Sequence, residues 1–197
     1  MTESVPTDPP LYLASQSPRR AELLDQIGVP YHPLDAAVDE AHRASETPEV
    51  YVERVAREKA EAGAARVTAP GVVLGADTAI ELGGRLLGKP ADRDEARSWL
   101  TALSGRDHHV LSAVALADGE ATACRVNRTR VVMRPLAPEE LEAYLATGEP
   151  DGKAGGYAIQ GRGALFVERI EGSYSAVMGL PLCETGQLLT EFGVRVL

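Results

Sequence analysis

The sequence predicts a mixed α/β protein, and three of its features support that prediction. Short apolar runs typical of strands alternate with longer segments in which apolar residues recur every three or four positions, as in helices. The chain has 197 residues, 44% hydrophobic and 25% charged, which allows a sizeable core. No repeat, low-complexity stretch or long linker interrupts it. Interleaved strands and helices favour an α/β or α+β domain over a helix bundle or a β-sandwich.

Each expected element follows from its local pattern. We expect strands at residues 11–14, 31–34, 71–82, 85–87, 110–116, 121–133, 165–170 and 175–178. We expect helices at residues 18–27, 48–67, 93–103, 138–146 and 181–192, and a glycine-rich loop at 148–163. Ser17 and Asp92 are expected to cap the helices that follow them, because their side chains can accept hydrogen bonds from the first turn.

The N-terminal residues and the cysteines indicate the cellular compartment in which the protein is expected. Residues 1–10, MTESVPTDPP, are expected to be a disordered leader before a single domain at residues 11–197. This leader lacks the basic and apolar regions of a signal peptide, and no apolar run is long enough to span a bilayer. Cys124 and Cys183 could pair, but free thiols in a reducing cytosol are the simpler interpretation. We therefore expect a cytoplasmic protein with no membrane partner.

The charge balance narrows the class of partner. The formal net charge is −9, whereas nucleic-acid binders are usually basic, so a nucleic-acid partner is not expected. An acidic protein can still bind a small polyanion where a few cations converge or a metal ion mediates.

The segment Ser15-Gln-Ser-Pro-Arg-Arg20 places Arg19 and Arg20 in the first turn of a helix. Their positive charges are unfavourable at this place, because the partial positive charge of a helix N-terminus favours negative groups. Backbone N–H groups there, with the hydroxyls of Ser15 and Ser17, could form an anion site in which both arginines bind a phosphate. The alternative is that the arginines fold back onto Glu22 or another nearby carboxylate.

Gly75-Ala-Asp77-Thr78 lies inside an apolar strand. A carboxylate is costly to bury there unless a metal ion, a cation or a bend at a cleft accommodates it. We favour a functional role for Asp77, because the small residues before it would let a ligand approach. The alternative is a bulge that turns Asp77 to solvent.

Two further segments carry polar groups suited to a nucleotide. Gly83 to Pro90 nearly matches the P-loop pattern, but Pro90 replaces the hydroxyl residue, so we reject that match and keep Lys89 as a single-charge phosphate ligand. In Lys153-Ala-Gly-Gly-Tyr-Ala-Ile-Gln160-Gly161, Gln160 offers a donor and an acceptor to a base or sugar. A surface lysine and a simple connecting loop are the respective alternatives.

Acidic and basic residues also recur at Val38-Asp39-Glu40 and on the second helix at Glu58-Lys59. Two or three carboxylates suffice for Mg²⁺, which keeps several waters. The alternative is a charged surface. His108-His109 lacks partners at metal-binding spacing, and the HExxH, paired CxxC, GxSxG and GxGxxG patterns are missing, so redox cofactors and a serine-hydrolase triad are unsupported.

Taken in order, SxSPRRxELL, VDE, REKA, GADT, GKP and KAGGYAIQG closely resemble the Maf family of nucleoside triphosphate pyrophosphatases. Leu103-Ser-Gly105 and FVERIEGSYSAVMGLPL add to the resemblance, which covers about residues 11–193. Each motif alone is weak, but six in this order are specific.

The resemblance implies an elongated fold like that of inosine triphosphate pyrophosphatases, with a mixed, twisted sheet and two lobes around a deep cleft. It implies hydrolysis of a nucleoside triphosphate to the monophosphate and diphosphate, with Mg²⁺ or Mn²⁺ as cofactor. A homodimer is one assembly that it allows, and the family is linked to arrest of septum formation.

The resemblance also implies roles for individual residues. Asp77 maps onto the catalytic carboxylate described as a proton acceptor, and Glu40 with Asp77 would hold the metal ion or orient water. Whether Asp77 is a base or a metal ligand stays open. The positions that the resemblance ties to substrate choice are Arg19, Thr78 and Gln160. The other positions that it places in the lining of the cleft are Ser15, Arg20, Glu40, Lys59 and Lys89. Lys59 and Lys89 would neutralise the leaving group.

The KAGGYAIQG segment is similar to the branch that acts on dTTP, UTP and related pyrimidine nucleotides. Gln16 and Ala79 depart from common family forms and could alter the width of the pocket. The alternatives are a non-catalytic nucleotide-binding regulator of septum formation, a pyrophosphatase of the 7-methyl-GTP type, and an enzyme of the same class that clears damaged or modified nucleotides.

Overall fold

A computed structural model describes residues 8–197 and confirms the mixed α/β class. The strands are β1 (Leu11–Ala14), β2 (His32–Pro33), β3 (Val72–Leu82), β4 (Arg85–Leu87), β5 (Asp107–Ala117), β6 (Thr122–Met133) and β7 (Val167–Glu171). The α-helices are α1 (Pro18–Gln26), α2 (Pro48–Ala64), α3 (Arg93–Leu103), α4 (Pro138–Leu145), α5 (Tyr174–Met178) and α6 (Leu182–Glu191). Two short 3₁₀ helices span Ala154–Gly156 and Arg162–Phe166. Of the expected leader, residues 1–7 lie outside the described residues.

The strands form one seven-stranded mixed sheet in the order β2-β1-β3-β5-β6-β7, with β4 paired to the end of β3. Strand β1 is parallel to β2 and β3, and the other pairs are antiparallel. Its register sets Ala14 opposite Gly75. The chain therefore leaves β1 beside the Gly75–Thr78 segment of β3, which brings the first two predicted sites together.

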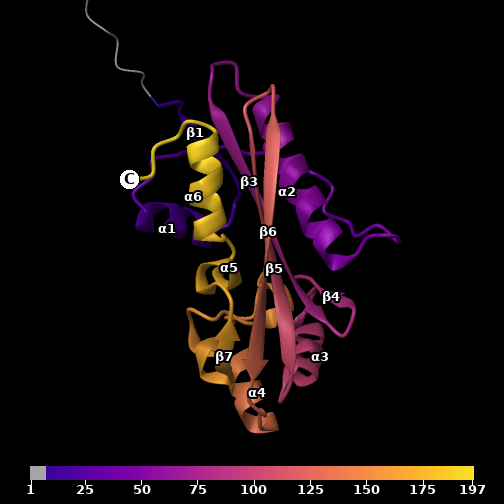
Figure 1. Cartoon of the computed structure of the whole chain (residues 1–197). Coiled ribbons are helices and arrows are strands. Elements are labelled where there is room, and N and C mark those ends of the chain that lie inside the picture. The colour runs from indigo at the N-terminus through magenta and orange to yellow at the C-terminus, as the bar shows by residue number, and fades with distance from the viewer. Residues whose placement is uncertain (1–7) are drawn as a thin grey trace, which may run out of the picture.

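Successive side chains of the long strands point to opposite faces of the sheet, so the two faces carry different residues. Val114 and Leu116 pack with α1 and α6, whereas Ala113, Ala115 and Ala117 pack against α2. Figure 1 accordingly shows α6 and α2 on opposite sides of the sheet. The alanines on the α2 face allow a close approach, and Gly75 allows the closest, since an added Cβ would lie 2.4 Å from the carbonyl oxygen of Ala56.

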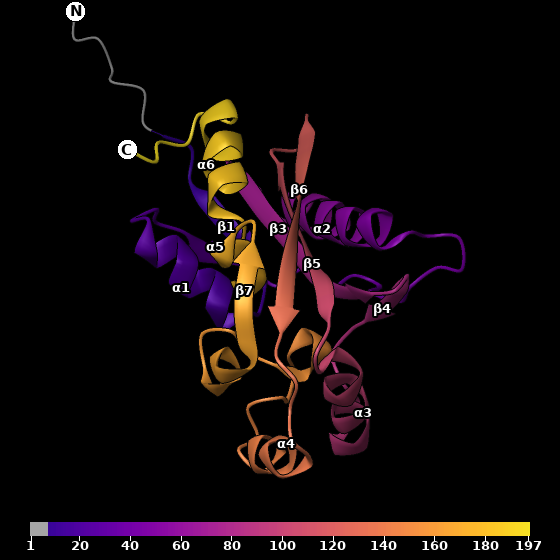
Figure 2. The same cartoon turned by 60° about the horizontal axis from the view of Figure 1, so that its bottom comes forward.

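A separate apolar cluster fills the other end of the molecule. It joins α3, α4 and Phe166 to the far parts of β3, β5 and β6. In Figures 1 and 2 these long strands run through the whole length, with α1, α2 and α6 around one end and α3 and α4 at the other. The two packed ends correspond to the two lobes that the resemblance implies.

The strand expected at 175–178 is wrong, because this segment forms helix α5. Ser173 caps it by accepting from the backbone N–H of Ala176, and Gly179, with φ 122°, ends it. These signals override the apolar pattern. Asp92 caps α3 as expected, whereas Ser17 occupies the N-cap position of α1 without a side-chain cap. The expected loop at 148–163 includes one 3₁₀ helix and the start of the other, and it buries Ala158 and Ile159.

No helix within residues 8–197 combines the length and the apolar character needed to cross a membrane. Cys124, on β6, and Cys183, on α6, are both free thiols, as expected. Burial raises the pKa of Cys124 to about 11, which keeps this thiol protonated near neutral pH.

Candidate active site

A cleft of about 570 Å³ lies between the two packed ends, and every predicted site residue lines it. The members of this set come from α1, α2, β3 and four connecting segments: Ser15, Ser17, Arg19, Arg20, Glu40, Lys59, Asp77, Thr78, Lys89 and Gln160. The fold thus gathers at one place residues that are up to 145 positions apart in the sequence, between Ser15 and Gln160. The parallel pairing of β1 with β3 and the packing of α2 on β3 account for the central part of this set.

The centre of the cleft is an ion-pair cluster of Lys59, Asp77 and Glu40. Lys59 lies on the apolar stripe by which α2 packs on the sheet, so its ammonium is directed at β3. Lys59 Nζ is 2.7 Å from Glu40 Oε1 and 3.1 Å from Asp77 Oδ1, and it donates to the carbonyl oxygen of Ala76 at 3.4 Å. All three ammonium protons thus have an acceptor. Asp77 is only 7% exposed, so the alternative of a bulge facing solvent is wrong.

Glu40 remains ionised in this cluster. Partial burial raises the pKa of Glu40, but the hydrogen bond and charge of Lys59, with the charges of Lys89 and Arg20, lower it further than burial raises it. The net pKa lies below the ordinary value, so Glu40 presents a carboxylate to the cleft at neutral pH.

The donor set suits a hard divalent cation in part. Glu40 and Asp77 contact the same ammonium, so two carboxylate oxygens lie close together at the cleft wall. Within residues 8–197, no group of three or more His, Cys, Asp or Glu side chains could hold a metal ion by itself. Mg²⁺ keeps several waters and commonly takes the rest of its oxygens from a phosphate substrate, so two carboxylates fit such an ion.

Arg20 is a buried residue that organises one wall. It is 8% exposed; its Nε donates to the carbonyl oxygen of Gly179 at 2.9 Å and its guanidinium NH1 to Ser15 Oγ at 2.9 Å. Its NH2 group is 3.4 Å from Thr78 Oγ1. Burial lowers the pKa of Arg20, and the negative charges of Asp77 and Glu40 partly oppose this effect. Arg20 therefore ties α1 to the residue after β1, to β3 and to the residue that ends α5.

Arg19 behaves differently, although it is the neighbouring residue. It is half-exposed and donates to both carboxylate oxygens of Glu22 at 2.8 Å. The alternative that the arginines fold back onto Glu22 is therefore right for Arg19 and wrong for Arg20. Because this ion pair is exposed, it costs little to exchange it for a phosphate.

Strand alternation separates Asp77 from Thr78. Asp77 meets Lys59 from α2, whereas Thr78 Oγ1 lies 2.7 Å from Ser112 Oγ on the next strand and 3.4 Å from the carbonyl oxygen of Gly179. Both residues still line the cleft, so this stretch of β3 contributes to it from both faces.

The glycine-rich segment and the Gly-Lys-Pro segment meet through one backbone hydrogen bond. The N–H of Gly155 donates to the carbonyl oxygen of Gly88 at 2.9 Å. Gly155 has φ +66°, and a Cβ there would lie 2.3 Å from Ile80 Cδ1, so any other residue would strain the backbone and displace Ile80. This contact brings Lys89 and Gln160 to the same cleft.

The buried pair of His108 and Tyr157 is a feature of the cleft that was not predicted from the sequence. His108 Nε2 lies 2.8 Å from the hydroxyl of Tyr157, which lines the cleft within the glycine-rich segment. The apolar pattern around His108 could have indicated a buried residue, but its partner is 49 residues away. Lys153, within the same glycine-rich segment, also lines the cleft, although it was not among the predicted site residues.

A sequence model described as "Maf-like protein" matches residues 10–192, almost the whole described chain. The chain belongs to the Maf family. A dTTP/UTP pyrophosphatase of Aromatoleum aromaticum is 53% identical over 93% of this chain and 95% of that protein. A dTTP/UTP pyrophosphatase of Alkalilimnicola ehrlichii is also 53% identical, over 94% of each chain. The matches cover nearly the whole of each chain, and the expected family resemblance is confirmed.

A solved nucleoside-triphosphatase / dITP/XTP pyrophosphatase of Mycobacterium abscessus is 18% identical to this Maf chain, with a TM-score of 0.38. The match covers 62% of this chain and 73% of that chain.

Proposed function

We propose that this Maf protein is a nucleoside triphosphate pyrophosphatase that hydrolyses dTTP and UTP to the nucleoside monophosphate and diphosphate. The observation that carries the proposal is the meeting of the Lys59–Asp77–Glu40 cluster with Arg19, Arg20 and Lys89 in one cleft. Relatives about half identical over nearly their whole length, named dTTP/UTP pyrophosphatases, support the same activity.

The cations of the cleft would bind and orient the triphosphate. Arg19 can exchange Glu22 for a phosphate, and Lys89 and Lys59 place further positive charge in the cleft wall. This arrangement explains why α1 begins with two arginines. Arg20 holds the wall of the cleft together, and Arg19 can release Glu22 and bind the anion. Phosphoryl-transfer catalysis depends mainly on such positioning and charge stabilisation.

Asp77 and Glu40 would act on the attacking water. Water adds to the α-phosphorus, the bond from that phosphorus to the bridging oxygen breaks, and diphosphate leaves with its charge next to the lysines. Asp77, fixed by Lys59, is the group we assign to accept the proton of the water or to hold the metal ion that binds it.

A divalent cation, Mg²⁺ or Mn²⁺, would be held by Glu40 and Asp77, and it would supply charge neutralisation and a more acidic bound water. We assign base recognition to Thr78 and Gln160, which present a hydroxyl and an amide to the cleft. Ser15 and Ser17 would add hydroxyl contacts to the phosphates.

The deciding experiment measures diphosphate release with Mg²⁺ or Mn²⁺ from dTTP, UTP, CTP, the purine triphosphates, 5-methyl-UTP and 7-methyl-GTP. We expect turnover of dTTP and UTP, loss of at least about 100-fold in Asp77→Asn, and unchanged turnover in the surface control Asp94→Asn. A folded protein that binds these nucleotides without turnover would overturn the enzymatic proposal and leave a nucleotide-binding regulator. Selective turnover of 7-methyl-GTP would assign the other branch.

Three further expectations belong to this proposal: a cytoplasmic location, inferred from the sequence, and a homodimer and a link to arrest of septum formation, both implied by the resemblance. Light scattering after gel filtration would test the dimer, and cell morphology on overproduction of the wild type and of Asp77→Asn would test the septum link.

A further inference from the structure

Arg54, on α2, has a fully used guanidinium although it lies outside the cleft wall. Its side chain is 12% exposed. Nε donates to a Glu46 carboxylate oxygen, NH1 to Glu58 Oε2 at 3.0 Å, and NH2 to Glu46 Oε2 at 3.1 Å. The two remaining N–H groups donate to the carbonyl oxygens of Asp39, at 3.3 Å, and Ala41, at 3.0 Å. All five N–H donors of the fork therefore have an acceptor.

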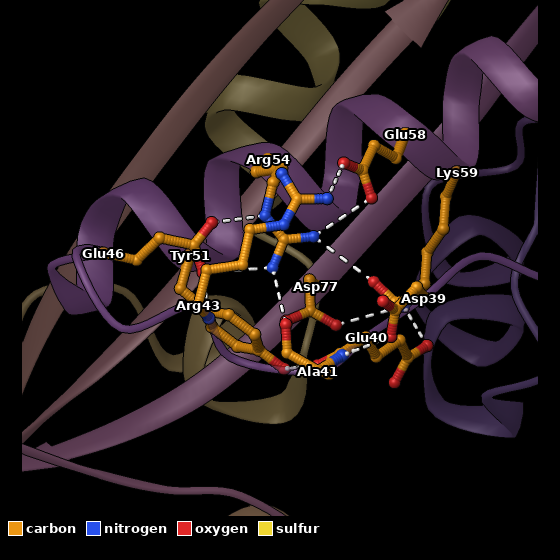
Figure 3. Close-up of polar contacts among 10 residues, drawn as sticks. All are labelled: Asp39, Glu40, Ala41, Arg43, Glu46, Tyr51, Arg54, Glu58, Lys59 and Asp77. Carbon is orange, nitrogen blue, oxygen red and sulfur yellow. Dashed lines mark hydrogen bonds and ion pairs between the residues drawn. The ribbon is translucent and has the colours of Figure 1, made fainter.

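These contacts fix the backbone on both sides of Glu40. Arg54 binds the carbonyl oxygens of Asp39 and Ala41, and the hydroxyl of Tyr51 donates to the carbonyl oxygen of Glu40 at 3.0 Å. Burial raises the pKa of Tyr51 to about 12, so it keeps this donor. Figure 3 shows Arg54 and Lys59 reaching this segment from the same helix, with Arg43 and Glu46 beside Arg54.

Glu40 depends on this backbone for its place. Its side chain is 44% exposed, and Lys59 is the partner the structure gives it within residues 8–197. Residues 34–43 contain neither helix nor strand, so no regular structure holds them. The segment is instead fixed by Tyr51 and Arg54, which precede Lys59 on the same helix, α2.

The carboxylates around Arg54 keep its guanidinium charged and hold it in one orientation. The hydrogen bond from Arg54 lowers the pKa of Glu46 to about 2, so this pair stays ionised at any ordinary pH. Arg43 adds a backbone donor to Glu46 Oε2, at 2.9 Å, and an ion pair with Glu58, at 3.1 Å.

We propose that Arg54 is a positioning residue for the hydrolysis of the triphosphate, acting through Glu40. This inference rests on the proposed function. Arg54 has no donor left for a substrate, so its effect is on where the Glu40 carboxylate stands relative to Asp77 and Lys59. Lysine cannot replace it, because a single ammonium cannot serve two carboxylates and two carbonyl oxygens in a planar fork.

The test compares Arg54→Lys with the matched control Arg57→Lys. Arg57 lies one turn along α2 and pairs with Glu53 at 2.9 Å, away from the Glu40 segment. For Arg54→Lys we expect kcat for dTTP to fall about 10- to 100-fold with KM changed less than about threefold, since misplacing a catalytic group affects mainly the chemical step. Amides of residues 39–46 should exchange hydrogen faster, while those of β3 keep their protection.

A double-mutant cycle with Glu40→Gln separates positioning from general stabilisation. If Arg54 acts through Glu40, Arg54→Lys should lower kcat less than about threefold in the Glu40→Gln background. An equal loss in both backgrounds, or a kcat like that of Arg57→Lys, would overturn the inference. Unchanged exchange at residues 39–46 would overturn the anchoring itself. A wild type that releases no diphosphate would instead overturn the proposed function.

Discussion

Lys59 Nζ lies 3.1 Å from Asp77 Oδ1, and this pair joins α2 to β3 at the floor of the cleft. Both side chains are about one-tenth exposed, so neither charge is freely hydrated. Glu40 is the third member of the cluster. Two carboxylates thus share one cation. Removing Lys59 therefore affects two ion pairs, whereas removing the charge of Asp77 affects one.

We expect Lys59→Met to destabilise the protein more than Asp77→Asn. Without Lys59, Asp77 and Glu40 face each other with no cation between them, which should lower the free energy of unfolding by about 1–3 kcal/mol. In Asp77→Asn the ammonium keeps Glu40 and Ala76, so we expect a loss below about 1 kcal/mol. Urea unfolding without nucleotide or metal measures both, and the opposite order would contradict the assigned pairing.

Arg19→Ala and Arg20→Ala should have separate effects. Arg20→Ala leaves the carbonyl oxygen of Gly179 and the Ser15 hydroxyl without their buried donor, so we expect about 2–3 kcal/mol less stability. Arg19→Ala removes only an exposed pair and should change stability by less than about 1 kcal/mol while raising KM for dTTP. Thermal unfolding and steady-state kinetics on both variants test this, and equal stabilities would show that Arg20 is not structural.

Gly75→Ala should damage the contact between α2 and β3. Its Cβ would lie 2.4 Å from the Ala56 carbonyl oxygen and 2.5 Å from the Ala60 nitrogen, and backbone cannot move aside cheaply. We expect a loss of at least about 2 kcal/mol. The control is Gly186→Ala inside α6, where a Cβ meets nothing within 4 Å, and which should gain about 0.5–1 kcal/mol. Urea unfolding of the two variants decides, and similar values would contradict the packing described.

His108 should make the protein less stable in mild acid. Burial, with a smaller contribution from His109, lowers the pKa of His108 from 6.5 to about 4, against the opposing charges of Asp107 and Glu81. Below pH 6.5 the unfolded chain binds this proton and the folded protein does not, so stability falls with pH until about pH 4. We expect His108 to account for about 2 kcal/mol of loss between about pH 6.5 and 4.5.

The check on this prediction is His108→Gln, which keeps a polar partner for Tyr157 and removes the titration. The loss of unfolding free energy in that pH window should shrink accordingly. An identical pH profile in the variant would show that other groups cause the acid sensitivity.

The sequence by itself determined the local elements and the chemical groups of the site. Residues 71–82 could be assigned to a strand from their apolar pattern, and the Asp77 carboxylate stood out because a strand interior rarely holds one. Capping by Asp92 was likewise local, since the donors lie within one turn. The six family motifs then named the residues that line the cleft.

Only the tertiary structure decided which of these residues are buried and hold the site together, and which are exposed to a ligand. The sequence could not separate Arg19 from Arg20, because burial of Arg20 depends on Gly179, 159 residues away. It could not place Arg54 behind Glu40 or His108 beside Tyr157. The first contact depends on how an irregular segment packs on α2, and the second on how another irregular segment packs on the sheet. Local patterns reflect interactions within a few residues, whereas these contacts arise from the pairing of strands and the docking of α2, which bring distant residues together.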